Sequence, residues 1–427
     1  MFGNRIFFGW WVLLGTFLSY MALVGVQVYT LPLFYPELMK EFSWNPEQVT
    51  RAGTIFYLAG AIITPFISSL FDRFSVRLFM LAGAMATIIG LYSYSLMQTL
   101  TQMILIYLIL AIAQVCAGQV PTMLVVVRWF ERKRGIAVGI VLMGTSIGAA
   151  VFPLVVRYIL ETGTWRDAIH VLMIICAVMM VLPVIFFIRS RPKDMGLQPD
   201  GDHAEKATAD PAKTQVEHRG PTLREALRMP SFYLIAVATG ALWFCINGMV
   251  HHQTIYMGDD LGIDTGTMAV IVSSFFWFAI VGKLLFGFLG DRFSKTLIMV
   301  VVVVNLILGL LILRFSGADD LRGLYAYAAV YGIGFSGTFT MIQLVIAEFF
   351  AGDSYGRILG ILTMVDVGAA GIAITILARM RMAFGSYLPV FEVLIGICCA
   401  VAVAAAILHK MRLNALRQAE AALSPAD

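Results

Sequence analysis

Charged side chains are scarce in this chain of 427 residues, and that scarcity argues against a soluble globular protein. Asp, Glu, Lys and Arg together make up 13% of the sequence, whereas hydrophobic residues make up 60%. Soluble domains carry about 25% charged residues. A chain so poor in charge and so rich in apolar residues is typical of a protein embedded in a lipid bilayer.

Cysteine is also rare, and its distribution argues against a disulfide framework. Such frameworks are typical of small secreted domains, whereas the cysteines of this chain lie within apolar segments. We therefore interpret them as small core side chains. The five are Cys116, Cys176, Cys245, Cys398 and Cys399.

Motifs of enzymes and of nucleotide-driven pumps are absent as well. The sequence has no Gly-x-x-x-x-Gly-Lys-Ser/Thr loop, so ATP-driven pumping by this chain is not supported. It has no Ser/His/Asp or metal constellation at membrane depth, so we predict neither an enzyme nor a cofactor. His251 and His252 are adjacent on one predicted helix, point to different faces and have no acid at ligand spacing, so we predict no metal there. One of them either senses external pH or simply lies in the wet interface.

Long apolar segments are what the sequence has in abundance. A helix needs about 20 residues to cross a hydrocarbon core of roughly 30 Å, and about twelve segments reach that length. We predict an all-α membrane protein with twelve transmembrane helices. The expected spans are residues 8–34, 49–71, 77–97, 102–127, 135–160, 167–188, 231–257, 266–290, 296–315, 322–347, 356–379 and 386–409.

Basic residues in the loops predict the orientation of the chain. With both ends inside and the long central loop left out, thirteen Lys and Arg residues fall on the cytoplasmic side and eight on the outer side. Because basic residues are enriched on the cytoplasmic side, we predict cytoplasmic N and C termini. The net charge of +4 is then explained by loops that face anionic lipid, and no nucleic-acid partner is needed. Short loops and compact tails favour a bacterial inner membrane.

One short pattern occurs twice, each time where an apolar segment meets a basic loop. The two copies centre on Asp72 and Asp291, 219 residues apart, and a second pair of glycines, Gly135 and Gly356, has nearly the same offset of 221 residues. The chain therefore consists of two copies of one six-helix unit in the same orientation. Parallel repeats of this kind are typical of secondary transporters.

The repeat predicts the domain organisation. We expect an N-terminal six-helix bundle over residues 1–188 and a C-terminal bundle with a cytoplasmic tail over residues 231–427. Residues 189–230 form the one long hydrophilic stretch, which we interpret as a cytoplasmic linker with too few large apolar residues in its middle to fold alone. We expect the protein to act as a monomer.

Two local motifs accompany the repeat. They are Trp-Phe-Glu-Arg-Lys-Arg-Gly-Ile-Ala at residues 129–137, followed by Gly139, Gly144, Gly148 and Pro153, and Gly-Trp-Trp-Val at residues 9–12. Together with the Asp-Arg loops, the sequence resembles the monocarboxylate transporter and oxalate/formate antiporter branch of the major facilitator superfamily. The resemblance implies a rocker-switch carrier for small organic anions, commonly short monocarboxylates, which are moved with a proton (symport) or by exchange with a counter-anion (antiport).

Two positions depart from the animal monocarboxylate transporters. Those proteins carry a Lys near the outer end of the first helix, where this chain has Gly-Val-Gln-Val-Tyr at residues 25–29. They also carry an Asp one turn before an Arg of the eighth helix, where this chain has Ala279 and Lys283. The cation of the eighth helix is thus a Lys here, and its acidic neighbour is missing.

Two charged residues are predicted to lie level inside the membrane. Lys283 is eight residues from Asp291, or about 12 Å at 1.5 Å per residue, and Asp366 is nine residues from Arg357, or about 13 Å. A charge at such depth costs at least about 2.5–3.5 kcal/mol and usually marks a transport pathway. We hypothesise that Lys283 binds the substrate carboxylate and that Asp366 is its ion-pair partner in the empty site and a candidate proton acceptor. The alternative is a purely structural ion pair.

Further polar and aromatic residues fall at a similar depth and are weaker candidates for substrate binding. Amides and phenols can donate hydrogen bonds, and rings can shape an apolar pocket. The alternative for each is helix packing. These candidates are Gln114, Gln119, Asn247, Tyr331, Tyr57, Trp243 and Trp277.

The two Asp-Arg loops are candidates for gating. Asp72 and Asp291 can accept hydrogen bonds from helix N-terminal amides or pair with Arg134 and Arg357, and such pairs would break when the halves tilt. The alternative is that the basic residues only orient the helices. The other basic members of the pattern are Arg73, Arg77 and Arg292.

The sequence leaves other functions open. Efflux of hydrophobic or cationic compounds is favoured if Asp366 rather than Lys283 faces the cavity. A non-transporting receptor on a transporter scaffold is a minor alternative, because residues 189–230 are too short and polar for a signalling domain.

Overall fold

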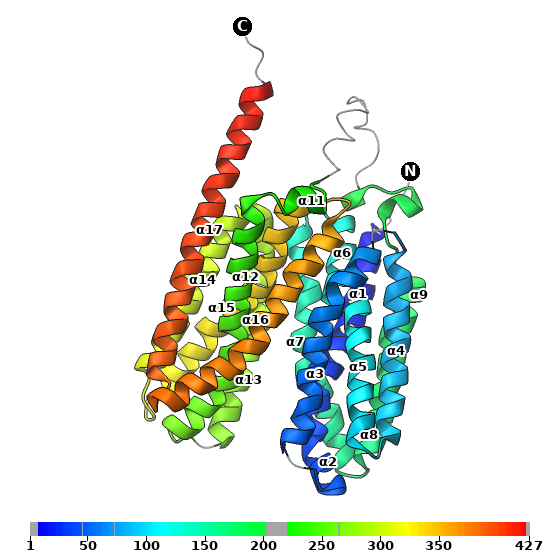
Figure 1. The fold of residues 1–427 in the computed structure, drawn as a ribbon, viewed down its shortest axis with the longest axis vertical. Helices are drawn as coiled ribbons and strands as arrows, with labels where there is room; N and C mark the ends of the chain where they lie inside the picture. The colour runs from blue at the N-terminus through cyan, green and yellow to red at the C-terminus, as the bar shows by residue number, and fades with distance from the viewer. Residues whose placement is uncertain (1–6, 45, 72, 202–219, 264, 424–427) are drawn as a thin grey trace, which may run out of the picture. The chain divides into compact units, whose positions relative to one another are not determined.

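The computed structural model describes residues 7–44, 46–71, 73–201, 220–263 and 265–423, and the described residues form helices and loops without β-strands. Twelve helical spans are long and apolar enough to cross a membrane. The predicted all-α fold with twelve transmembrane helices is therefore confirmed, and the chain is a multi-pass membrane protein. Figure 1 follows these helices along the chain.

The first six spans contain several local breaks. Their elements are α1 (Gly9–Val24) with the π-helix η1 (Gly25–Thr30) and η2 (Leu31–Phe34), then α3 (Pro46–Leu70), α4 (Val76–Leu96), α5 (Leu100–Ala117) with α6 (Gln119–Trp129), α7 (Arg134–Leu160), and α8 (Trp165–Cys176) with η3 (Ala177–Val181) and α9 (Leu182–Phe186). A short helix outside these spans, α2 (Tyr35–Phe42), follows the first of them.

The last six spans are longer and mostly unbroken. They are α12 (Pro230–Ile255) with the π-helix η7 (Tyr256–Asp260), α13 (Thr265–Arg292), α14 (Lys295–Phe315), α15 (Leu321–Phe350), α16 (Tyr355–Phe384) and α17 (Leu388–Leu423). The short elements before them are η4 (Pro192–Met195), η5 (Pro199–Gly201) and α11 (Leu223–Ala226).

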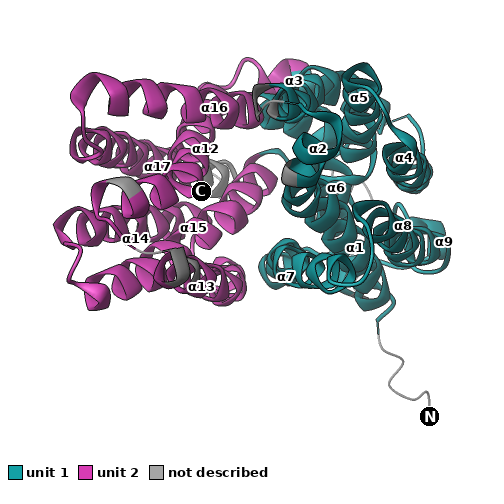
Figure 2. Cartoon of the chain, turned by 90° about the horizontal axis from the view of Figure 1, so that it is seen from below, with its two compact units in different colours: residues 1–223, 350–364 teal, residues 224–349, 365–427 magenta. Residues whose placement is uncertain are grey.

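Two compact units divide the chain (Figure 2). Unit 1 comprises residues 1–223 and 350–364, and unit 2 comprises residues 224–349 and 365–427. The first turns of α16 therefore belong to unit 1 and the rest of that helix to unit 2. The predicted boundaries at 188 and 231 stay a prediction.

Glycine permits a close helix contact in unit 1. A Cβ on Gly148 of α7 would lie 2.7 Å from the carbonyl oxygen of Met21 and 3.1 Å from the Cα of Gly25. Lipid tails are as apolar as the side chains, so membrane helices associate through close van der Waals packing, and small residues make it possible. The start of η1 is thus held against α7 backbone to backbone.

A polar cluster attaches α2 to the start of α8. Glu41 accepts hydrogen bonds from Trp165 Nε1 at 2.6 Å and from Arg166 Nη1 at 3.1 Å, and its other oxygen lies 2.8 Å from Arg166 Nη2. The Arg166 hydrogen bond, followed by that of Trp165, lowers the pKa of the Glu41 carboxyl below its ordinary value. The short helix is therefore tied to unit 1 through a charged pair outside the spans.

Both ends of unit 2 carry polar links between helices. At one end, Glu348 of α15 lies 2.6 Å from Arg412 of α17 and 3.6 Å from Lys295 of α14. At the other end, His252 of α12 has Nδ1 at 2.6 Å from the Tyr387 hydroxyl and Nε2 at 3.0 Å from the Ile374 carbonyl oxygen. A carbonyl can only accept, so Nε2 carries the proton and Nδ1 accepts from Tyr387. His252 is thus a structural link, while His251 is exposed; a pH-sensing role stays a prediction.

The Gly148 contact predicts how unit 1 responds to one added methyl group. Gly148→Ala should lower the free energy of unfolding by about 1–3 kcal/mol, because the backbone of α1 and η1 must move. Gly60→Ala is the matched control, since a Cβ on Gly60 of α3 meets no atom within 4 Å. Thermal unfolding of both purified variants in detergent checks this. Equal midpoints for the two variants would contradict the close contact.

Glu41 predicts a small pH dependence of stability. Because its folded pKa is depressed, the carboxylate stabilises the fold above its unfolded pKa, and that contribution is lost as the pH falls through the folded pKa. The pair is over a third exposed, so we expect at most about 1 kcal/mol. The difference in unfolding midpoint between wild type and Glu41→Gln should shrink on going from pH 7 to pH 3.5. Glu37→Gln, an exposed acid of the same helix, should show no such change.

Candidate functional site

Lys283 is buried in unit 2, where it faces aromatic rings. Its side chain projects from α13, only 3% of the residue is exposed, and Nζ lies 5.6 Å from the ring centroid of Phe339 on α15. Phe339 packs edge to face against Trp243 of α12, with ring centroids 4.7 Å apart and planes at 70°. An ammonium over a ring face is attracted by the ring quadrupole. Three helices therefore meet around one cation.

Asp366 lies on α16 and is 1% exposed. Neither of its carboxyl oxygens has a hydrogen-bond partner among the described residues. Thr239 of α12 is its neighbour, although the two groups do not reach hydrogen-bond geometry. The carboxyl is therefore buried beside a hydroxyl without being bound by it.

No hydrogen bond joins the Asp366 carboxyl to Lys283 among the described residues. Sequence spacing placed the two residues at one depth, but depth does not fix the direction in which each helix turns its side chain. Lys283 has the ring of Phe339 of α15 near it, and Asp366 has Thr239 of α12. The predicted ion pair of the empty site therefore stays a prediction.

Buried polar atoms without hydrogen-bond partners are spread over the described residues, and some of them lie on helices next to these two charges. Apart from Asp366, the atoms concerned are Thr239 Oγ1, Trp243 Nε1 and Gln343 Oε1. Thr239 and Trp243 are one turn apart on α12, as are Phe339 and Gln343 on α15, so each pair shares a helix face. Each unsatisfied buried group costs about 1–3 kcal/mol. We define the unit 2 cluster as Thr239, Trp243, Lys283, Phe339, Gln343 and Asp366.

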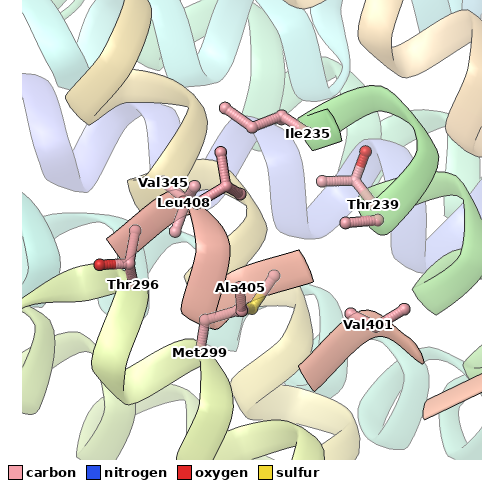
Figure 3. Close-up of a pocket in the computed structure, with 9 residues that line it drawn as sticks. Ile235, Thr239, Thr296, Met299, Val345, Val401, Ala405 and Leu408 are labelled. Carbon is pink, nitrogen blue, oxygen red and sulfur yellow. The ribbon is translucent and has the colours of Figure 1, made fainter. Parts of the chain in front are cut away.

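A small apolar cavity lies next to this cluster and is not itself a substrate pocket. Thr239 and Ile235 of α12 form part of its wall, opposite residues of α14, α15 and α17 (Figure 3). Its volume is about 10 Å³, room for about one water molecule, whereas ligand pockets measure about 300–1,000 Å³. We interpret it as a packing gap.

The remaining unit 2 candidates are outside the cluster. Asn247 Nδ2 donates to the Ala370 carbonyl oxygen at 3.0 Å, which ties α12 to α16. Tyr331 is 1% exposed and stacks on Tyr327 with ring centroids 5.4 Å apart. Trp277 is 67% exposed on α13. The Tyr331 hydroxyl has no hydrogen-bond partner among the described residues, and the binding roles of these side chains stay predictions.

In unit 1, Gln114 and Gln119 flank a break in one transmembrane span. α5 ends at Ala117, Gly118 leaves helical geometry with φ −83° and ψ −139°, and α6 begins at Gln119. Gln114 Oε1 is buried without a hydrogen-bond partner among the described residues. Tyr57 is 45% exposed. Broken helices are common at transporter sites, so these residues stay candidates.

Only part of the first copy of the gating pattern lies within the described residues. Asp72 lies outside the described residues, and Arg73 is exposed. Arg77 Nε donates to the Val184 carbonyl oxygen at 3.0 Å, and Arg134 Nε donates to that of Phe130 at 3.1 Å. Both arginines bind main-chain carbonyls within unit 1, a structural role that the sequence pattern did not predict.

The second copy is described more fully. Arg292 is exposed and stacks on Phe288 of its own helix, with Cζ 4.2 Å from the ring centroid. Asp291 is half-buried at the end of α13, and Arg357 lies near the start of α16. Their predicted roles as gate residues stay a prediction.

Three cluster residues were missed from the sequence. Thr239, Phe339 and Gln343 are uncharged and occur in segments full of similar residues. The available signal was helical spacing, because Thr239 lies one turn before the candidate Trp243. Phe339 and Gln343 had no charged neighbour within one helical turn to single them out.

Known proteins resemble the chain over nearly its whole length. The model of the Major Facilitator Superfamily matches residues 12–256 and 243–425. Monocarboxylate transporter 6 of Mus musculus is 25% identical over 370 residues, covering 83% of this chain and 77% of the relative. Monocarboxylate transporter 13 of Bos taurus is 24% identical over 390 residues, covering 90% and 85%. The crystal structure of FucP, a transporter of the same superfamily in the outward conformation, shares the fold with a TM-score of 0.68 at 14% identity, covering 93% of this chain and 98% of FucP.

The Asp366 carboxyl, which has no hydrogen-bond partner among the described residues, should lower the stability of the fold. Asp366→Leu should raise the free energy of unfolding by about 1–3 kcal/mol, because it removes a buried polar group that nothing compensates. Asp319→Leu, in an exposed loop of the same unit, should change it little. Thermal unfolding in detergent measures both. A lower midpoint for Asp366→Leu would mean that the carboxyl is held by partners after all.

Proposed function

The chain belongs to the Major Facilitator Superfamily, and we propose that it is a secondary active transporter of small organic anions of the monocarboxylate type. It works by rocker-switch alternating access, driven by a gradient rather than by ATP. Relatives named as monocarboxylate transporters match most of the chain, which supports the substrate class. The positive charge of Lys283 supports a negatively charged substrate.

Lys283 is the observation that carries this proposal. A charge inside a transmembrane span costs at least about 2.5–3.5 kcal/mol, and a protein keeps it where a ligand or partner supplies the opposite charge. The rings of Phe339 and Trp243 give the ammonium an apolar surrounding in which a substrate carboxylate would be held by a charge-assisted hydrogen bond. A short carbon chain would then lie against the rings.

Asp366 is the proposed proton acceptor. An isolated carboxylate removed from water is so costly that such a group binds a proton instead, and Asp366 is buried without partners. Its proximity to Thr239 within the unit 2 cluster supports transport of the anion together with a proton over exchange with a counter-anion.

Gating and orientation complete the proposal. Asp72 and Asp291, with Arg134 and Arg357, would act as latches at the cytoplasmic ends of the helices, with Arg73, Arg77 and Arg292 as the flanking basic residues. Both termini would lie in the cytoplasm, and the membrane would be the inner membrane of the cell. The basic loops support this orientation.

Efflux of hydrophobic or cationic compounds is the second candidate function. The partnerless carboxyl of Asp366 is the observation that favours it, because a buried acid attracts a cation as readily as a proton. The positive charge of Lys283 in the same cluster disfavours a cationic substrate, since like charges repel. The two functions therefore differ in which of the two residues contacts the substrate.

The test is transport by Lys283→Ala and Lys283→Arg in reconstituted vesicles. Counterflow of radiolabelled lactate or oxalate should fall at least about tenfold in Lys283→Ala, the loss expected when a hydrogen bond to a charged group is removed. Lys283→Arg should retain part of the activity. Lys40→Ala, an exposed lysine of α2, should transport normally.

Running the same vesicles with and without a pH gradient tests the coupling. Uphill accumulation that needs the gradient supports proton coupling, and accumulation that needs only internal anion supports exchange. Normal counterflow in both Lys283 variants would remove Lys283 from the site. Drug resistance without carboxylate counterflow would favour efflux, and binding without movement would favour a receptor.

A further inference from the structure

Two buried cysteines of unit 2 face each other across the contact between α12 and α17. Cys245 of α12 and Cys398 of α17 are both 0% exposed, and their thiol groups lie within reach of each other. Cys245 Sγ also lies 3.9 Å from the carbonyl oxygen of Leu394, one turn before Cys398. The Cys245 side chain therefore reaches across to the surface of α17, where the second sulfur is.

The other cysteines do not form such a pair. In the described part of unit 1, Cys116 of α5 and Cys176 of α8 are buried without another cysteine beside them. Cys399 is exposed on α17 and lies on a different side of the helix from Cys398, because successive helical residues do not share a face. A buried thiol packs as a small apolar side chain and needs no second thiol. The contact between Cys245 and Cys398 is therefore not explained by packing alone.

A buried hydroxyl lies next to the two thiols. Tyr331 of α15 is 1% exposed, and its hydroxyl lacks a hydrogen-bond partner in the part of the chain that the structure describes. Cys245 and Cys398 are both electrostatic neighbours of this hydroxyl. Tyr327, which stacks on Tyr331, differs because its hydroxyl donates to Gln253 Oε1 at 2.8 Å. One phenol therefore keeps a hydrogen to donate beside the sulfur pair.

We propose that Cys245 and Cys398 form an oxidation site, at which a hydroperoxide converts the two thiols to a disulfide. With hydrogen peroxide, one sulfur attacks a peroxide oxygen, the O–O bond breaks, and a sulfenic acid and one water form. The second sulfur then attacks the sulfenic sulfur, so that the S–S bond forms, the S–O bond breaks and a second water leaves. Two electrons pass from the sulfurs to the peroxide, and both thiol protons end in the two waters.

Tyr331 stabilises the intermediate of this reaction. A sulfenic acid is polar, and a polar group in an apolar surrounding is costly unless it forms a hydrogen bond. The Tyr331 hydroxyl donates that bond to the sulfenic oxygen. Burial keeps the thiols in their less reactive protonated form, so the oxidation is slow and the second thiol, already in place, traps the intermediate.

The packing around the pair leaves room for the crosslink. The sulfurs of a disulfide are about 2.05 Å apart, closer than two thiols in contact, so α12 and α17 must approach slightly. These helices already pack with Cα atoms within 8 Å of each other. The packing gap of Figure 3 lies between them, with Thr239 of α12 and Val401 of α17, one turn after Cys398, in its wall. A small approach of the helices therefore fills a gap and does not force a clash.

The test is oxidation of the purified protein in detergent with hydrogen peroxide. The Cys399→Ala background removes the exposed thiol, which would otherwise link two molecules. After oxidation the protein is unfolded, its remaining thiols are alkylated, and the peptides are analysed by mass spectrometry. We expect two thiols to be lost, a linked pair of peptides that contains Cys245 and Cys398, and recovery of both thiols with dithiothreitol. The thermal unfolding midpoint should rise on oxidation and fall back on reduction, because the crosslink restricts the unfolded chain.

Matched variants separate the pair from the other cysteines. Cys245→Ala in the same background should form no disulfide, and its unfolding midpoint should not rise with peroxide. Cys176→Ala, which removes a buried cysteine of unit 1, should form the disulfide as the background protein does. If Cys245→Ala does not fold, the linked peptides of the background protein still decide the question.

Tyr331→Phe tests the role of the phenol. Disulfide formation should slow about threefold to tenfold, as expected for the loss of one hydrogen bond to the intermediate. Tyr325→Phe, an exposed tyrosine of the same helix, should react at the unchanged rate, and equal rates for both variants would overturn the role of Tyr331. Retention of both thiols, or oxidation of either sulfur to a sulfinic acid without a linked peptide, would overturn the oxidation site itself. None of these measurements requires transport, so they are independent of the proposed function.

Discussion

A positive charge that water cannot solvate is the constraint on which unit 2 depends. Lys283 lies on α13 with 3% of its surface exposed, and its Nζ lies 5.6 Å from the ring centroid of Phe339. Attraction to a ring stabilises an ammonium by about 0.5–2 kcal/mol, which is less than the cost of placing the charge inside a membrane span. The proposed anion site of unit 2 is argued from this buried cation and from the packing of α12, α13 and α15 around it.

Polar groups elsewhere in the chain show what a structural role requires. Gln27 Nε2 donates to Thr87 Oγ1 at 3.0 Å, Asn247 donates to a carbonyl of α16, and Arg77 binds carbonyls of α9. In each case the polar group links two elements, as expected where no water can take the place of a partner. Thr239, Trp243 and Asp366 lie at comparable depth without such links. Unsatisfied atoms also occur elsewhere, on Gln27, Tyr94 and Tyr331 for example, so the unit 2 cluster is set apart by the two buried charges that accompany them.

Features that depend on the length of a segment and on the lipid solvent could be predicted from the sequence. Contacts that depend on the direction of a side chain could not. Twelve spans followed from hydropathy, because the bilayer fixes the length of a helix. Lys283 and Asp366 stood out because charge is rare in such segments. Their ion pair stays a prediction, since equal depth leaves the rotation of each helix open. Thr239 and Phe339 could not be singled out among many similar residues, and the bond from Arg77 to Val184 joins residues 107 positions apart, which no local pattern encodes.

Charge balance connects the two ionisable groups even though they do not touch. With a neutral Asp366 and a charged Lys283, the empty cluster carries one positive charge, and a bound monocarboxylate brings it to zero. With an ionised Asp366 the empty cluster is neutral, and the same substrate leaves one uncompensated negative charge in a medium of low dielectric constant, where such charges are costly. Anion binding therefore favours the protonated acid, and by reciprocity of linkage the protonated acid favours anion binding. In the proposed symport, coupling of a proton to an anion would need no direct contact between Lys283 and Asp366, because both groups are buried in unit 2.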